Sequence, residues 1–119
     1  ETTNNFINAI KQENLDSLDQ YVDNKSFRYI YPSESNPLNI NINEFISMLE
    51  QSFSAGGMYE VLYLKNTTTG ADTVDEVKIT GTIEASGIDA DGYYFESNRE
   101  VEITINKIEG SWLLTKFVW

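Results

Sequence analysis

Apolar residues recur at helical spacing in the first half of the chain and at alternating positions in the second half. In the first half this spacing predicts, in order, a helix over 3–13, an amphipathic turn over 15–22, a strand over 26–31, and a helix from Asn43 to Gly56-Gly57. Pro32 stops the strand, and residues 33–42 form a loop that has room for a short strand over 38–42.

From Met58 onward the period of the pattern changes from 3.6 to 2, which indicates strands. Strands are predicted over 58–66, 74–85, 93–106 and 111–119, and turns over 66–73, 86–92 and 109–110. Helices followed by an antiparallel meander are typical of an α+β domain in which helices cover one face of the sheet. The whole chain, 1–119, is therefore expected to form a single α+β domain.

Composition excludes several kinds of function. The 119 residues include 19 acidic and 8 basic side chains, a net charge of -11, which repels nucleic acid and anionic lipid. No apolar run approaches the ~20 residues of a membrane span, so no direct membrane insertion is expected. The absence of histidine and cysteine removes catalytic triads, thiolate nucleophiles and the commonest metal ligands, and neither a metal nor a cofactor is predicted.

The chain begins with Glu1 and a polar Thr-Thr-Asn-Asn segment instead of a methionine. We interpret this start as the place where a signal peptide, an anchor or an upstream domain was removed, which predicts a secreted or surface-anchored, extracytoplasmic protein. A trimmed expression tag would leave the same start, and a cytoplasmic protein is also compatible with it.

Two segments carry a resemblance to a known superfamily. The first runs from Phe6 to Asp23 and contains Leu-Asp-Ser-Leu at 15–18, and the second is the closing Gly-Ser-Trp-Leu-Leu at 110–114. These segments, and the order of helices and strands between them, resemble the nuclear transport factor 2-like superfamily with its cystatin-like cone. The resemblance implies a strongly bent antiparallel sheet wrapped around the helices into a cone, often dimeric, with a pocket at the open end. Members include isomerases, dehydratases and polyketide cyclases as well as non-catalytic transport adaptors, assembly domains and extracytoplasmic modules.

The catalytic residues of ketosteroid isomerase, a member with well-defined chemistry, are absent at the matching positions. Phe6 stands where that enzyme has its oxyanion tyrosine, Tyr31 where it has its base before a proline, and Thr104 where it has its protonated acid. The histidine-dependent dehydratases and cyclases are excluded because the chain has no histidine. No catalytic residue is assigned, and the sequence predicts a non-catalytic ligand-binding or assembly domain. The alternative is a small-molecule isomerase, dehydratase or polyketide-cyclase-like enzyme that uses carboxylate and tyrosine chemistry.

Arg99 has an unusual place in the third long strand. It shares the parity of an apolar face that contains Tyr93, Phe95, Val101, Ile103 and Ile105, so either Arg99 points into the cone or the strand changes environment twice. A buried guanidinium needs an acidic partner or an anionic ligand, which leaves three alternatives: an internal ion pair, exposure at the pocket mouth, or ligand recognition. Folding this strand back about the 86–92 turn sets Gly81 opposite Ser97 and Ile79 opposite Arg99.

Tyrosines supply the other candidate ligand contacts. Tyr29 and Tyr31 share a face of the first strand, and Tyr59 and Tyr63 share a face of the next long strand. The predicted ligand-binding residues are Tyr29, Tyr31, Tyr59, Tyr63, Phe95 and Arg99. The predicted ligand is small and apolar or aromatic.

Two of the predicted strands, 58–66 and 111–119, carry apolar residues on both faces, whereas the outer face of a helix-covered sheet should be polar. In strand 58–66, Leu62 and Leu64 lie on one face and Val61 and Tyr63 on the other. In strand 111–119, Leu113 and Phe117 lie on one face and Leu114 and Val118 on the other. A second copy of the chain would cover such an outer face, so a homodimer through the sheet is predicted.

Overall fold

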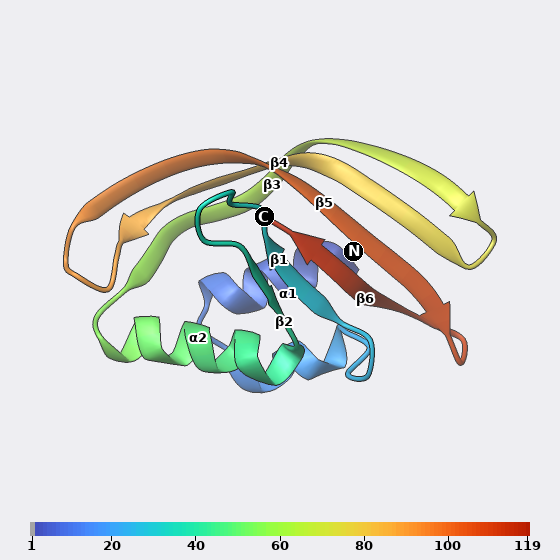
Figure 1. Ribbon diagram of the computed structural model, residues 1–119, viewed down its shortest axis with the longest axis horizontal. Coiled ribbons are helices and arrows are strands. Elements are labelled where there is room, and N and C mark those ends of the chain that lie inside the picture. Colours follow the sequence, from blue (N-terminus) through green and yellow to red (C-terminus); the bar gives the residue numbers. More distant parts are fainter. Residues whose placement is uncertain (1) are drawn as a thin grey trace.

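The computed structural model describes residues 2–119, apart from the side chain of Asp72. Its elements are, in chain order, α1 (Thr2–Lys11), the 3-10 helix η1 (Leu15–Gln20), β1 (Arg28–Tyr31), β2 (Leu38–Ile40), α2 (Ile42–Ser54), β3 (Met58–Thr73), β4 (Glu76–Ile88), β5 (Tyr94–Ile108) and β6 (Ser111–Val118). Helices precede a meander of four long strands, which confirms the predicted α+β class (Figure 1).

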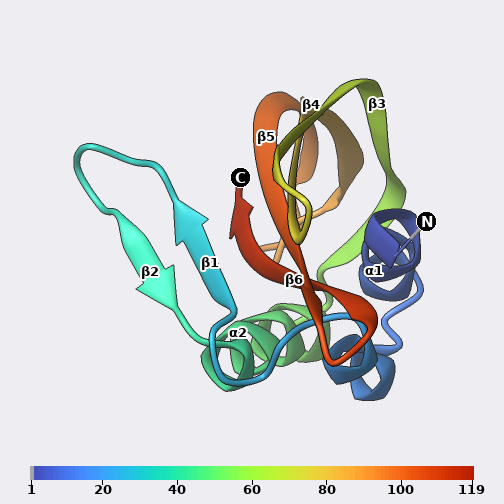
Figure 2. The ribbon, with the colours of Figure 1, turned by 90° about the vertical axis from the view of Figure 1, so that its right-hand side faces the viewer.

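The strands form one bent sheet in the order β2-β1-β6-β5-β4-β3. Neighbouring strands are antiparallel except β1 and β6, which pair in parallel. The long strands β3, β4 and β5 arch over the helices, and α1 and α2 lie within the curve (Figure 1). Figure 2 shows β1 and β2 on the opposite side of the curl from β3, so the sheet wraps around the helices as a cone without closing.

The N-terminus of α2 lies two residues earlier than the sequence pattern predicts. Asn41, not Asn43, is the N-cap, because its side chain accepts a hydrogen bond from the Glu44 backbone N–H at 2.9 Å. The Glu44 carboxylate in turn accepts the backbone N–H of Asn41 at 3.1 Å. This reciprocal capping box satisfies two otherwise unpaired donors and fixes the start of the helix that covers the cavity described below.

Two expected turns are wrong in position. Strand β3 continues through the predicted 66–73 turn as far as Thr73, because Asn66 adopts a φ of 55° within a bulge and the strand then pairs again with β4. Strand β4 extends to Ile88, and the following loop closes tightly because the Asp89 side chain accepts the backbone N–H groups of Asp91 and Tyr93 at 3.0 and 2.9 Å.

The longer β4 shifts its register against β5. Arg99 lies opposite Ile83 and not Ile79, and Ser97 lies opposite Ala85 and not Gly81. Each predicted partner is displaced by four residues, an even number, so the faces of the two strands are still those that the sequence predicts. Tyr93 is different: it lies in the loop before β5 with 72% of its surface exposed, outside the apolar face to which it was assigned.

Aromatic rings fill the space between the helices and the concave face of the sheet. Phe6, Phe27, Phe45 and Phe117 are each at most 2% exposed. The Phe6 ring centroid lies 5.4 Å from that of Phe117 and 6.1 Å from that of Phe45. These rings join α1, α2 and β6, and they form the floor of the cone.

The outer face of the sheet is more polar than the sequence pattern suggests. A bulge opposite Thr104 and Ile105 turns Leu114 and Phe117 inward together, and both are fully buried. The outer side of β4 and β5 carries carboxylates at Glu84, Glu100 and Glu102, which alternate with the buried inner residues. The homodimer through the sheet stays a prediction.

Candidate functional site

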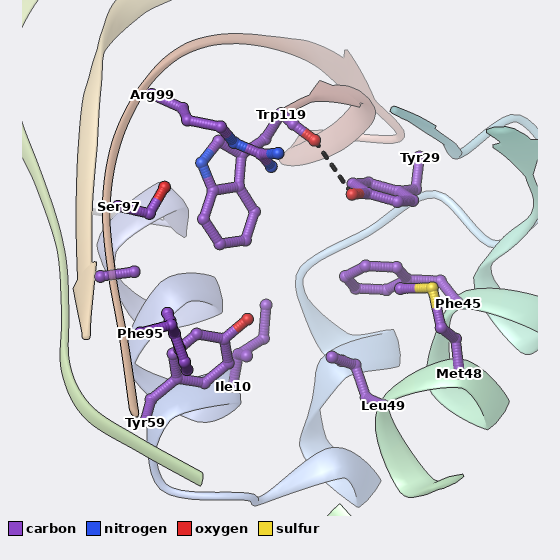
Figure 3. Close-up of a pocket in the computed structure, with 11 residues that line it drawn as sticks. Ile10, Tyr29, Phe45, Met48, Leu49, Tyr59, Phe95, Ser97, Arg99 and Trp119 are labelled. Carbon is purple, nitrogen blue, oxygen red and sulfur yellow. Dashed lines mark hydrogen bonds between the residues drawn. The ribbon is translucent and has the colours of Figure 1, made fainter. Parts of the chain in front are cut away.

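A cavity of about 280 Å³ lies between α1, α2 and the concave face of the sheet (Figure 3). Its walls are mostly aromatic and aliphatic side chains that reach it from both helices and from β1, β3, β4 and β5. The lining residues are Ile10, Tyr29, Phe45, Met48, Leu49, Tyr59, Ala85, Phe95, Ser97, Arg99 and Trp119. Four of the six predicted ligand-binding residues, Tyr29, Tyr59, Phe95 and Arg99, are therefore brought together around one space.

Arg99 points into this cavity from β5, on the same face as Phe95 and Ser97 (Figure 3). Its guanidinium carbon lies over two aromatic rings, 5.1 Å from the centroid of Tyr31 and 4.9 Å from that of Trp119. Such cation–π contacts stabilise a guanidinium without neutralising its charge. Within residues 2–119 no carboxylate forms an ion pair with Arg99, so the internal ion pair considered above is not found there.

Tyr29 and Trp119 form one wall of the cavity. The Tyr29 hydroxyl donates a hydrogen bond to the main-chain oxygen of Trp119 at 2.9 Å, and the Trp119 backbone N–H bonds to Ile30 at 3.0 Å. The Tyr29 ring also packs on Phe45, with 4.8 Å between ring centroids. The end of β6 is thus fixed to β1, and the indole of Trp119 is held beside Arg99.

Trp119 is the site residue that the sequence reasoning missed. Its position two residues after the fully buried Phe117 places it on the same inward face of the last strand. That alternation was visible in the sequence and would have identified it.

Tyr59 and Phe95 form the opposite wall. Their rings meet edge to face, with centroids 5.8 Å apart, and both also line a second cavity of about 240 Å³ next to Met58 and Ile88. The two rings therefore separate the central cavity from a smaller space at the tip of the β4–β5 hairpin.

Tyr63 and Tyr31 lie outside the lining. The prediction that Tyr59 and Tyr63 share a face is wrong, because a bulge between Tyr59 and Val61 reverses the alternation of β3. Tyr63 is 44% exposed and donates a hydrogen bond to Glu84 at 2.5 Å. Tyr31 reaches the site only through Arg99, whose guanidinium it covers.

Burial controls the acid–base properties of the two cavity tyrosines. Desolvation raises the pKa of Tyr29, and the nearby Arg99 guanidinium offsets part of that rise. Desolvation also raises the pKa of Tyr59. Both phenols are therefore neutral at pH 7 and act as hydrogen-bonding groups with apolar rings.

Alkaline titration should detect these two phenols. Absorbance at 295 nm is expected to show Tyr29 and Tyr59 ionising above the ordinary tyrosine pKa of about 10. Their folded-state pKa exceeds the unfolded value, so their contribution to stability is complete below pH ~10 and is lost as the pH rises through the folded pKa. The substitutions Tyr29→Phe and Tyr59→Phe should each remove absorbance change from the late part of the curve. Loss from the early part instead would contradict the burial of these hydroxyls.

Among residues 2–119, no group of three or more acidic side chains could hold a metal ion. No helix in that range has the length and apolar character needed to cross a membrane.

Comparisons with known proteins show the fold. No protein-family model and no curated protein matches the sequence. Among solved structures, a nuclear transport factor 2-like protein from Cytophaga hutchinsonii is 14% identical with a TM-score of 0.81, and the match covers 98% of this chain and 89% of that one. A ketosteroid isomerase-like protein from Erwinia carotovora atroseptica is 11% identical with a TM-score of 0.73, covering 95% and 85%.

A third similar structure is the association domain of C. elegans CaMKII, which is 13% identical with a TM-score of 0.72. The match covers 98% of this chain and 87% of that one. The similar structures thus range from an isomerase-like protein to an association domain. At these identities the similarity establishes architecture and not activity. The chain therefore has the nuclear transport factor 2-like fold, as its opening helices and closing hairpin predicted.

Proposed function

We propose that this chain is a non-catalytic domain that binds a small apolar or aromatic molecule inside its cone. The cavity of about 280 Å³ carries the proposal, because its walls are mainly aromatic and aliphatic. This volume is close to the lower limit of small-molecule sites, roughly 300 Å³, which suits a ligand with one or two fused rings. The location outside the cytoplasm and the homodimer stay predictions.

The chemistry of the lining supports binding over catalysis. The lining residues include no carboxylate and no lysine, and the raised pKa of Tyr29 and Tyr59 leaves neither phenol able to act as a base at neutral pH. The three positions that match the catalytic residues of ketosteroid isomerase also favour binding over catalysis. Phe6 belongs to the core, and neither Tyr31 nor Thr104 lines the cavity. An isomerase or dehydratase would need a proton acceptor that this cavity does not offer.

Filling the cavity should weaken binding of a neutral aromatic probe. Ala85 is 1% exposed and lines the cavity, so Ala85→Leu places extra methyl groups in the space that the ligand would occupy. We expect the affinity for 2-naphthamide, measured by NMR titration, to fall by at least about tenfold.

The matched control is Ala71→Leu, which makes the same change at an exposed position of β3 and should leave the affinity unaltered. Circular dichroism would verify that both variants are folded, and Ser97→Leu offers a second way to fill the cavity. Unchanged binding in a folded Ala85→Leu protein would place the probe elsewhere. If the unmodified protein bound neither this amide nor the corresponding carboxylate at millimolar concentrations, the proposed function would be contradicted.

A further inference from the structure

Two buried nitrogen atoms beside the cavity have no hydrogen-bond acceptor within residues 2–119: Nε of Arg99 and Nε1 of Trp119. Both side chains line the cavity, and Figure 3 shows the indole nitrogen on the side of its ring that faces Arg99 and Ser97. Buried donors in folded proteins are almost always paired. Two adjacent unpaired donors therefore indicate an acceptor that comes from outside the chain.

The charge of Arg99 is also unbalanced. No carboxylate of the described residues forms an ion pair with it, and the Tyr29 hydroxyl nearby is neutral and already donates its proton to Trp119. A partly buried guanidinium without a counter-charge is unfavourable, and an anion in the cavity would remove that cost.

The rings around Arg99 determine how an anion could approach. Tyr31 and Trp119 lie against the guanidinium at 5.1 and 4.9 Å, so aromatic surfaces cover it. Guanidinium N–H groups lie in the plane of the group, where a carboxylate can accept two of them side by side. The stacked rings hold that plane in place and reduce the entropy lost when an anion binds.

The rest of the lining limits the ligand to a single charge. Arg99 is the only cationic side chain among the lining residues, and the far wall consists of Tyr59, Phe95 and Leu49. A second negative charge would lie against apolar groups, in a protein whose net charge of -11 already repels anions.

We propose that the cavity binds a monoanionic aromatic or apolar carboxylate, with its carboxylate at Arg99 and the Trp119 indole N–H and its apolar body against Tyr59 and Phe95. This inference rests on the proposed function and narrows its ligand to one chemical class. The net negative charge of the protein repels anions, so the local positive charge of Arg99 is what would attract one into the cavity.

Two probes of nearly the same shape test the proposal: 2-naphthoate, which is ionised at pH 7, and the neutral 2-naphthamide. In the unmodified protein we expect 2-naphthoate to bind about 10- to 100-fold more tightly, as expected for a charge-assisted pair of hydrogen bonds. Titrations followed by ¹⁵N NMR should shift the Nε–H resonance of Arg99 and the indole N–H resonance of Trp119 with the carboxylate.

Arg99→Met keeps the apolar stem and removes the charge, so it should abolish the preference for 2-naphthoate over 2-naphthamide. Arg99→Lys keeps a positive charge but lacks the planar guanidinium with its paired N–H donors, so it should retain part of the preference for 2-naphthoate. Arg28→Met is the matched control, because it removes the chain's other arginine from an exposed position of β1. If Arg99→Met does not fold, Arg99→Lys decides the outcome.

Salt distinguishes the cavity from a surface site. Raising NaCl from about 0.05 to about 0.5 M should weaken 2-naphthoate binding by less than about threefold, because partly buried pairs are poorly screened. Equal affinities for the two probes, a preference that survives in folded Arg99→Met, or a much larger salt effect would each overturn this inference and leave the proposed function standing. Binding of neither probe would overturn both.

Discussion

Replacing Phe117 with alanine is expected to lower the free energy of unfolding by about 3–5 kcal/mol, the range for truncating a fully buried phenylalanine. Phe117 has no exposed surface, and its ring contacts those of Phe6, Tyr29 and Trp119 at centroid distances of 5.4, 5.7 and 5.9 Å. These rings come from α1, β1 and the end of β6, and their backbones are fixed by hydrogen bonds, so the void can close only in part.

Urea unfolding followed by circular dichroism would measure the loss, and the melting temperature should fall by about 10–20 °C. Tyr93→Ala is the matched control: it removes an aromatic ring that is 72% exposed and should change stability by less than about 0.5 kcal/mol. Phe117→Leu keeps much of the apolar volume and should lose about half as much as the alanine variant. A loss below about 1 kcal/mol for Phe117→Ala would mean that this ring does not support the floor of the cone.

Phe117→Ala should also weaken ligand binding by more than the loss of folded protein explains. Trp119 stacks on Phe117 with 28° between ring planes, and its ring centroid also lies 4.9 Å from the guanidinium carbon of Arg99. Removing the ring beneath Trp119 frees the indole to move, and with it the guanidinium that it covers. Ligand affinity should therefore fall even under conditions where most of the Phe117→Ala protein is folded.

The fold could be predicted from the sequence because it depends on the periodic spacing of apolar residues, which is visible along the whole chain. The helical stripe around Phe6 and Ile10 and the alternation of β5 both survive in the structure. The predicted register of β4 against β5 was wrong, but the residues assigned to each face of these strands were still correct, because the displacement was an even number of residues. The parity of Arg99 left an inward direction as one of two alternatives, and it is the direction that Arg99 has in the structure.

The features that the sequence did not reveal are those set by single-residue irregularities. A bulge near Tyr59 sends Tyr63 to the outer face, and a second bulge turns both Leu114 and Phe117 inward. A bulge depends on how the partner strand approaches, which no pattern within one strand records. The aromatic cover of Arg99 was hidden for a related reason. Tyr31 and Trp119 are 88 residues apart in sequence, and the parallel pairing of β1 with β6 brings both rings to Arg99.

A glycine in the facing strand lies against the bulge beside Tyr59. Gly87 pairs with Tyr59, and a Cβ atom at Gly87 would lie 2.0 Å from the carbonyl oxygen of Met58, a distance at which β3 must move away. Tyr59 is the first residue of the irregular segment, so this displacement would act directly on one wall of the cavity. We therefore expect the inward position of Tyr59 to depend on this close approach of the two backbones.

Gly87→Ala is accordingly expected to destabilise the protein by about 2–3 kcal/mol and to weaken binding of 2-naphthamide by about tenfold, because the backbone that carries Tyr59 is forced outward. Gly70→Ala is the matched control: it lies in the same β3–β4 ladder, a Cβ there meets nothing within 4 Å, and stability should stay the same or rise by up to about 1 kcal/mol. Urea unfolding and NMR titration would measure both quantities. If Gly87→Ala were as stable as the control and bound the probe normally, the bulge would not depend on this contact, and another feature would have to direct Tyr59 inward.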